Sequence, residues 1–143
     1  MVPRLLADLD LSQNLESHGN PDDRSRRAYW AFKALGTNAS AAAPQLLGLF
    51  DSNPGYTVAA YAAVLGSQAI PQLIASLGST RDYVRWNAAS ALQEFEPSQT
   101  REAIPFLVQG WDDPNSNVSS RMRLALQTID PTAYEQATQA HDQ

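Results

Sequence analysis

Two adjacent segments, AIPQLIASL at residues 69–77 and DYVRWNAASAL at residues 82–92, contain the pattern that the rest of the chain repeats. In the first segment apolar residues follow the i, i+3, i+4, i+7 spacing of an amphipathic helix. These residues are Ile70, Leu73, Ile74 and Leu77. The second segment places Val84, Ala88, Ala91 and Leu92 along one side in the same way. Gly78 and Ser79 separate the two segments, so the sequence predicts a hairpin of two short helices.

Variants of both segments alternate along the whole chain. Short helices are marginal in water, so each hairpin must bury its apolar surface against the next. The first-helix pattern recurs at residues 2–6, 43–47, 70–74 and 104–108, and the second-helix pattern ends at residues 34–36, 64–66, 91–93 and 125–127. We therefore expect an all-α fold, a right-handed α-solenoid of about four short antiparallel helical hairpins. The array is predicted to span residues 1–131, with residues 132–143 forming a C-terminal tail or a short capping helix.

The run Asp82-Tyr-Val-Arg85-x-x-Ala-Ala-x-Ala-Leu92 resembles the HEAT-like repeat that also occurs in phycobilisome lyases. The resemblance covers nearly the whole chain and implies a fold rather than one function, because this repeat serves many roles. In the family the arginine pairs with an aspartate of the adjoining turn. The resemblance therefore implies structural roles for Asp82 and Arg85, with Asp82 or Asp51 as the partner of Arg85.

Composition restricts the partners. The net charge of −5 and the sequence pI of about 4.8 make nucleic acid and acidic membranes unfavourable partners. No apolar run of membrane-spanning length is expected. The chain has no cysteine, and neither His18 nor His141 has a second ligand at helical spacing, so we expect no metal and no cofactor. The lack of cysteine is compatible with either redox compartment, and a cytoplasmic location is favoured.

No catalytic motif stands out. The sequence lacks a Gly-x-Ser-x-Gly elbow, a P-loop and a dinucleotide-binding fingerprint. We therefore expect a non-enzymatic scaffold that binds a protein or peptide. Two alternatives stay open: an enzyme on the same fold, either phycobilin lyase-like or DNA glycosylase-like, and a structural module of a larger chain. Adjacent acidic residues such as Asp112 and Asp113 are interpreted as helix capping.

The resemblance implies that the second helices line a concave binding face. Counting back from the leucine that ends each second helix selects the residues expected on this face: Tyr29, Trp30, Lys33, Trp86, Asn87, Ser90 and Arg121. The same count selects Ala59, Ala60 and Ala63 in the second hairpin. Aromatic residues and arginine are the types that dominate interface energetics. The alternative is that Trp30 or Trp86 packs between neighbouring hairpins.

The beginning of the chain reads as an internal repeat rather than as a cap. Leu5, Leu6 and Leu9 give the first helix an apolar side without a polar outer face. Further repeats or a partner are therefore expected to cover this end. Residues 10–23 are interpreted as a surface insertion.

Overall fold

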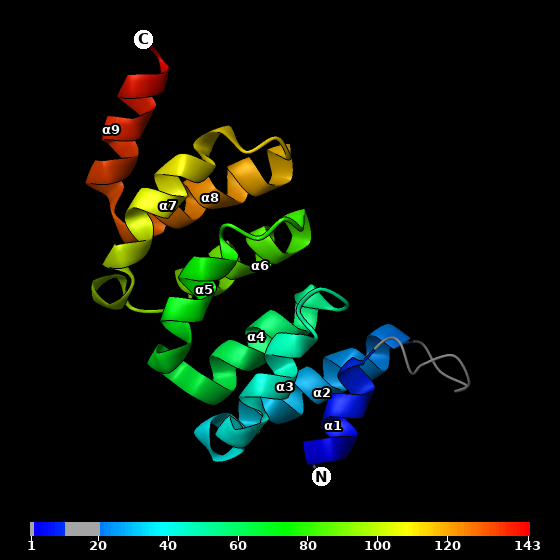
Figure 1. Ribbon diagram of the computed structural model, residues 1–143. Coiled ribbons are helices and arrows are strands. Elements are labelled where there is room, and N and C mark those ends of the chain that lie inside the picture. The colour runs from blue at the N-terminus through cyan, green and yellow to red at the C-terminus, as the bar shows by residue number, and fades with distance from the viewer. Residues whose placement is uncertain (1, 11–20) are drawn as a thin grey trace. The chain divides into compact units, whose positions relative to one another are not determined.

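The structure, a computed structural model, describes residues 2–10 and 21–143 (Figure 1). Every regular element in these two ranges is a helix, so the prediction of an all-α helical repeat is confirmed. The chain divides into two compact units, Met1–Ala69 and Ile70–Gln143. Most of the predicted insertion, together with His18, lies outside the described residues.

Unit 1 is built around α2. Its elements are α1 (Val2–Leu9), α2 (Pro21–Leu35), η2 (Gly36–Ala42), α3 (Ala43–Gly48), α4 (Pro54–Leu65) and η3 (Gly66–Ala69). Helix α2 packs against both α1 and α4. The side chains of Leu9, Phe32 and Leu46 are completely buried in this unit. Gly36 and Gly66, which follow α2 and α4, have φ angles of 53° and 58°, a conformation that glycine adopts without steric cost.

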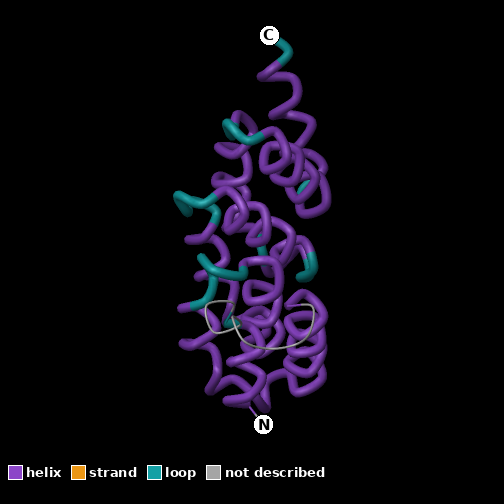
Figure 2. The backbone as a smooth tube through the Cα atoms, turned by 90° about the vertical axis from the view of Figure 1, so that its right-hand side faces the viewer, coloured by secondary structure: helices purple, strands orange, loops and turns teal. Residues whose placement is uncertain are grey.

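Unit 2 is built around the contact between α6 and α8. Its elements are α5 (Ile70–Ser76), α6 (Asp82–Gln93), η4 (Pro97–Gln99), η5 (Arg101–Ala103), α7 (Ile104–Gln109), η6 (Gly110–Asp112), α8 (Ser116–Ile129) and α9 (Pro131–His141). Helices α6 and α8 lie side by side, and short loops join successive helices (Figures 1 and 2). Leu73, Leu92, Leu107 and Leu126 are fully buried. The Asp130 carboxylate accepts a hydrogen bond from the Ala133 amide at 3.1 Å and so caps α9.

One helical run is longer and more apolar than the sequence suggested. Residues 54–76 form 23 consecutive helical positions that could cross a membrane by length and composition alone. The run is interrupted at Gly66, where φ is positive, and passes from α4 through a 3-10 turn into α5. Val58, Val64 and Leu73 are completely buried in it. We interpret it as core helix of the repeat, and the expectation that no such run exists is wrong.

Candidate binding faces on the second helices

A partly buried ion pair joins α6 to the turn that precedes α8. The guanidinium of Arg85 on α6 donates from Nε to Asp113 Oδ2 at 2.8 Å and from Nη2 to Oδ1 at 2.9 Å. Its third donor, Nη1, reaches the Ser79 carbonyl at 2.9 Å. The predicted partner of Arg85 was therefore wrong, because Asp113 of the following turn takes the place expected for Asp82 or Asp51. A two-point arginine–carboxylate pair fixes both position and orientation.

Burial and hydrogen bonding compete at this pair. Burial raises the pKa of the Asp113 carboxyl, but the hydrogen bonds from Arg85 and from the Asn115 amide outweigh it, so the pKa lies below its ordinary value. The hydrogen bond to Asp113 raises the pKa of Arg85, against an opposing effect of burial. Both groups are therefore charged at neutral pH.

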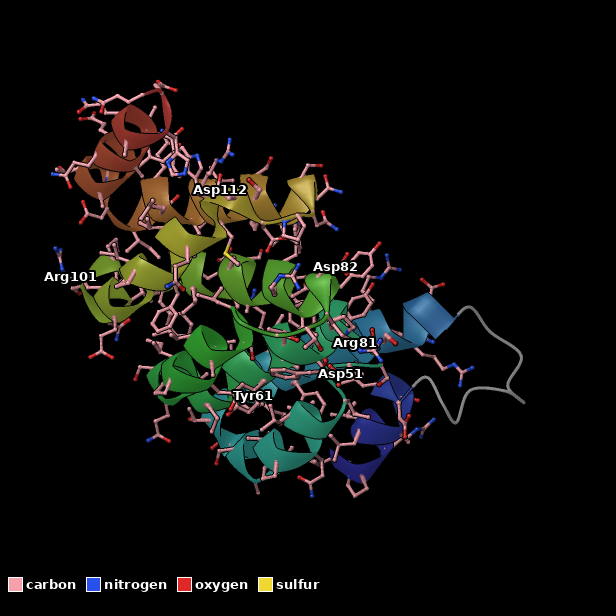
Figure 3. The ribbon with its side chains drawn as sticks, turned by 45° about the horizontal axis from the view of Figure 1, so that its top comes forward. Asp51, Tyr61, Arg81, Asp82, Arg101 and Asp112 are labelled. Carbon is pink, nitrogen blue, oxygen red and sulfur yellow. The ribbon has the colours of Figure 1, made fainter. Side chains whose placement is uncertain are left out.

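Asp82 takes part in a second contact between α6 and the beginning of α8. Its Oδ2 accepts a hydrogen bond from the Asn115 side-chain amide at 2.7 Å. Asn115 in turn caps α8 by accepting from the Asn117 amide at 2.9 Å. Figure 3 labels Asp82 on α6 and Asp112 in the turn before α8. The first turn of α6 and the beginning of α8 are thus held together by one polar network.

In unit 1 a neutral side chain makes the corresponding contact between helices. The buried Asn53, which precedes α4, donates from its side-chain nitrogen to the Leu9 carbonyl and to Ser25 Oγ, each at 3.1 Å. Ser25 Oγ also donates to the Asp8 carbonyl at 3.3 Å. One asparagine therefore connects α1, α2 and α4.

The α6–α8 face consists of six residues that share the outward side of these two helices. They are Tyr83, Trp86, Asn87, Ser90, Arg121 and Leu124. The Arg121 guanidinium lies 4.4 Å from the centre of the Trp86 ring, and its Nη1 is 3.5 Å from Gln93 Oε1. The pair is partly buried, whereas Tyr83 is 72% exposed and Leu124 43% exposed. Trp86 is thus covered on one side by an arginine.

The α2–α4 face consists of Tyr29, Trp30 and Lys33 on α2 and Tyr56 on α4. The rings of Tyr29 and Trp30 have centres 5.3 Å apart, and those of Tyr29 and Tyr56 are 6.3 Å apart. Lys33 Nζ lies 5.0 Å from the centre of the Trp30 ring. Trp30 is 57% exposed, so the alternative that it packs between hairpins is wrong.

The sequence count identified most of these positions but began one helical turn too late. Tyr56 and Tyr83 lie three residues before the first counted position of their helices, and helical periodicity alone would have included them. Ala60 was expected on the outward side but is completely buried. The reason is that α4 is apolar on every side, so its pattern did not show which side faces the core.

A second aromatic cluster in unit 2 was not expected from the sequence. The rings of Trp111 and His141 are stacked, with their centres 4.8 Å apart. The Arg123 guanidinium lies 4.7 Å from the centre of the Trp111 ring. His141 also contacts Asp112 Oδ2 through Nε2 at 3.1 Å and the Ala137 carbonyl through Nδ1 at 2.9 Å. Trp111 is only 6% exposed, so this cluster attaches the end of α9 to η6.

Among residues 2–10 and 21–143 no group of three histidine, aspartate or glutamate side chains could hold a metal ion. The groups that the two outward faces present for contact with a ligand are therefore aromatic rings, cations and a side-chain amide.

The family model for HEAT repeats matches residues 56–127, from α4 to the last turn of α8. A search of curated proteins finds no match, and a search of solved structures finds none either. The matched span holds the Arg85–Asp113 pair and the whole α6–α8 face, and it begins after α2. The chain therefore belongs to the family of HEAT repeat proteins, helical scaffolds that often serve in protein interaction.

Proposed function

We propose that this protein is a non-enzymatic scaffold that binds a protein or peptide on the outward faces of its second helices. The observation that carries the proposal is the exposure of Trp30, more than half of whose surface faces solvent beside Lys33 and Tyr29. Exposed tryptophan is costly in water and is enriched among residues that dominate binding energy. The α6–α8 face repeats the same chemistry with Trp86 and Arg121.

The family supports this proposal at a coarser level. HEAT repeats form helical scaffolds that often serve in protein interaction, and each of the two faces here lies on a second helix. The enzyme alternatives, lyase-like and glycosylase-like, stay predictions from the resemblance.

Photo-crosslinking in cells of the native source tests the proposal. The photoreactive residue benzoylphenylalanine replaces Trp30 or Trp86. The matched control is Phe106, which is 45% exposed and lies on α7, the first helix of the last hairpin. We expect a discrete protein adduct from positions 30 or 86 and none from position 106. Adducts of equal yield from all three positions, or none from any, would contradict a specific binding face.

A stability measurement separates loss of binding from loss of fold. Trp30→Ala should change the free energy of unfolding by less than about 1 kcal/mol, because surface positions contribute little. Trp111→Ala removes a buried ring and should cost about 3–5 kcal/mol. A partner adduct that is lost in the folded Trp30→Ala variant assigns the binding to the α2–α4 face.

A further inference from the structure

The solvent side of α2 combines cations with a tryptophan. Exposed positions recur along this helix at three- and four-residue intervals and include Arg26, Arg27, Trp30 and Lys33, which we call the α2 patch. The buried side of the same helix carries Ser25, Ala28 and Phe32. The patch therefore lies on the side that no described helix of unit 1 covers.

Two cations of the α2 patch are not neutralised by a carboxylate within the described part of the chain. Arg26 pairs with Asp23 at 2.7 Å. Lys33 Nζ lies 5.0 Å from the centre of the Trp30 ring and 6.0 Å from that of the Tyr29 ring, and it forms no ion pair with a described residue. Arg27 is exposed and makes no ion pair to a described residue. Two positive charges therefore stand beside an exposed indole ring.

The first turn of α2 contains Asp22 and Asp23, and α1, which packs against α2, contains Asp8 and is followed by Asp10. After these residues the sequence around the patch is poor in acidic residues. Residues 24–50 contain no aspartate or glutamate, although the whole chain has 15 acidic residues against ten lysines and arginines. Helix α4, which packs against α2, contains no charged residue at all. A positive surface in a protein with a net charge of −5 is a local exception, and it attracts a ligand of opposite charge.

We propose that the α2 patch binds an acidic peptide segment that also carries an aromatic or large aliphatic side chain. This inference rests on the proposed binding function and names its ligand. Carboxylates of the segment pair with Arg27 and Lys33, and the apolar side chain packs on the Trp30 ring. Arginine recognises a carboxylate through two parallel hydrogen bonds, and tryptophan supplies a large apolar contact.

Charge favours a peptide over a nucleic acid. Binding to a phosphate backbone gains from many cations that each release counterions, and the α2 patch offers two that are not paired. The excess of acidic residues elsewhere in the chain repels a long polyanion, whereas a short acidic segment contacts the patch alone. The patch also lies outside residues 56–127, so the family match does not assign it.

Selection from a random twelve-residue peptide library displayed on phage tests the inference. We expect selected peptides to be enriched in aspartate and glutamate together with aromatic or leucine residues. Synthetic copies labelled with fluorescein then give dissociation constants from fluorescence anisotropy. Arg27→Gln combined with Lys33→Gln should weaken binding about tenfold, which corresponds to the loss of two charge-assisted contacts. Trp30→Ala should abolish it.

The matched control combines Arg4→Gln with Arg101→Gln, which removes the same charge from two exposed positions on other helices. This variant should keep the affinity within about twofold of the original protein, since neither arginine belongs to the α2 patch. Equal weakening in both double variants would overturn the inference, because the effect would then follow total charge. Tighter binding of a fluorescein-labelled twelve-residue oligouridylate than of the acidic peptides would assign the patch to nucleic acid instead.

The outcomes also separate this inference from the proposed function. Selected peptides that are neutral or basic, but still lose binding with Trp30→Ala, would refute the acidic ligand and keep the scaffold. Concentration-dependent dimerisation in analytical ultracentrifugation that disappears in the Arg27→Gln, Lys33→Gln variant would make a second copy of this chain the occupant. That result would also overturn the acidic-peptide assignment.

Discussion

The two units of this protein use their cations differently. In unit 2 each central arginine is held by a neighbour: Arg85 by Asp113, Arg121 by Trp86 and Gln93, and Arg123 by Trp111. In unit 1 the side chains of Arg27 and Lys33 face solvent around Trp30. Arginines therefore stabilise the packing of helices in unit 2, whereas in unit 1 we propose that Arg27 and Lys33 contact a ligand.

The polar contacts that join successive hairpins, which we call joints, also differ between the two units. Unit 2 uses a charged pair with side chains only 15% and 8% exposed, and unit 1 uses the neutral amide of Asn53. A buried charge that loses its partner is much more costly than an amide that loses one hydrogen bond. Unit 2 should therefore be the more sensitive of the two to mutation and to pH.

Replacing Arg85 by methionine should have the largest effect. The methionine side chain would keep an apolar stem but leave the Asp113 carboxylate without its cationic partner, so we expect a loss of about 3–5 kcal/mol. Urea unfolding followed by tryptophan fluorescence measures the change, and hydrogen exchange assigns it to α6 and α8. The double variant Arg85→Met, Asp113→Leu should recover most of the loss. Persistent destabilisation in the double variant would show that shape, and not the unpaired charge, carries the effect.

Replacing Asn53 by alanine should cost less, about 1–2 kcal/mol. The change removes the donor of the buried Leu9 carbonyl and of Ser25 Oγ, which weakens the attachment of α1. Faster amide exchange in α1, measured by mass spectrometry, checks this expectation. The exchange of α8 serves as the internal control, and a loss as large as that of Arg85→Met would erase the proposed difference between the joints.

Acid should loosen unit 2 through Asp113. Because the folded-state pKa of this carboxyl lies below its ordinary value of about 3.9, its contribution to stability is complete above that value and is lost as the pH falls below it. As the pH falls below about 3.9, the original protein should lose free energy of unfolding relative to the Arg85→Met, Asp113→Leu variant, which lacks the carboxyl. A difference that stays constant from about pH 6 to about pH 3 would contradict the ionic joint. Asn53 does not titrate, so its joint should be unaffected.

The smallest effect is expected at the end of α9, on the alkaline side. Both contacts of His141 are to acceptors, so making both at once requires the doubly protonated ring. The hydrogen bond with Ala137 and then that with Asp112 raise its pKa, so the contribution is complete below about 6.5 and is lost as the pH rises through the raised value. Relative to His141→Gln, amide exchange near the end of α9 should increase as the pH rises across this range. Identical pH profiles for the two proteins would refute the role of His141.

The helical hairpins could be predicted from the sequence, but the contacts between them could not. Helical periodicity and turn residues located every second helix, because they report which side of a helix is apolar. The partner of Arg85 could not be chosen, since several aspartates lie near helix ends and only the packing of α6 on α8 brings Asp113 to the guanidinium. The sequence also could not show which side of α4 faces the core, because α4 carries small apolar residues on every side. Trp30 was assigned to a binding face by counting, and its exposure now supports that proposal.

A paired comparison of Arg85→Gln and Lys33→Gln tests the central claim most directly, because both remove one positive charge. The free energy of unfolding and the affinity for a selected acidic peptide are measured for each variant and for the original protein. We predict that Arg85→Gln loses about 3 kcal/mol of stability and keeps its affinity under folding conditions, whereas Lys33→Gln keeps its stability and loses several-fold in affinity. If the two variants lose stability and affinity to the same degree, the division of labour between structural and ligand-binding cations is wrong.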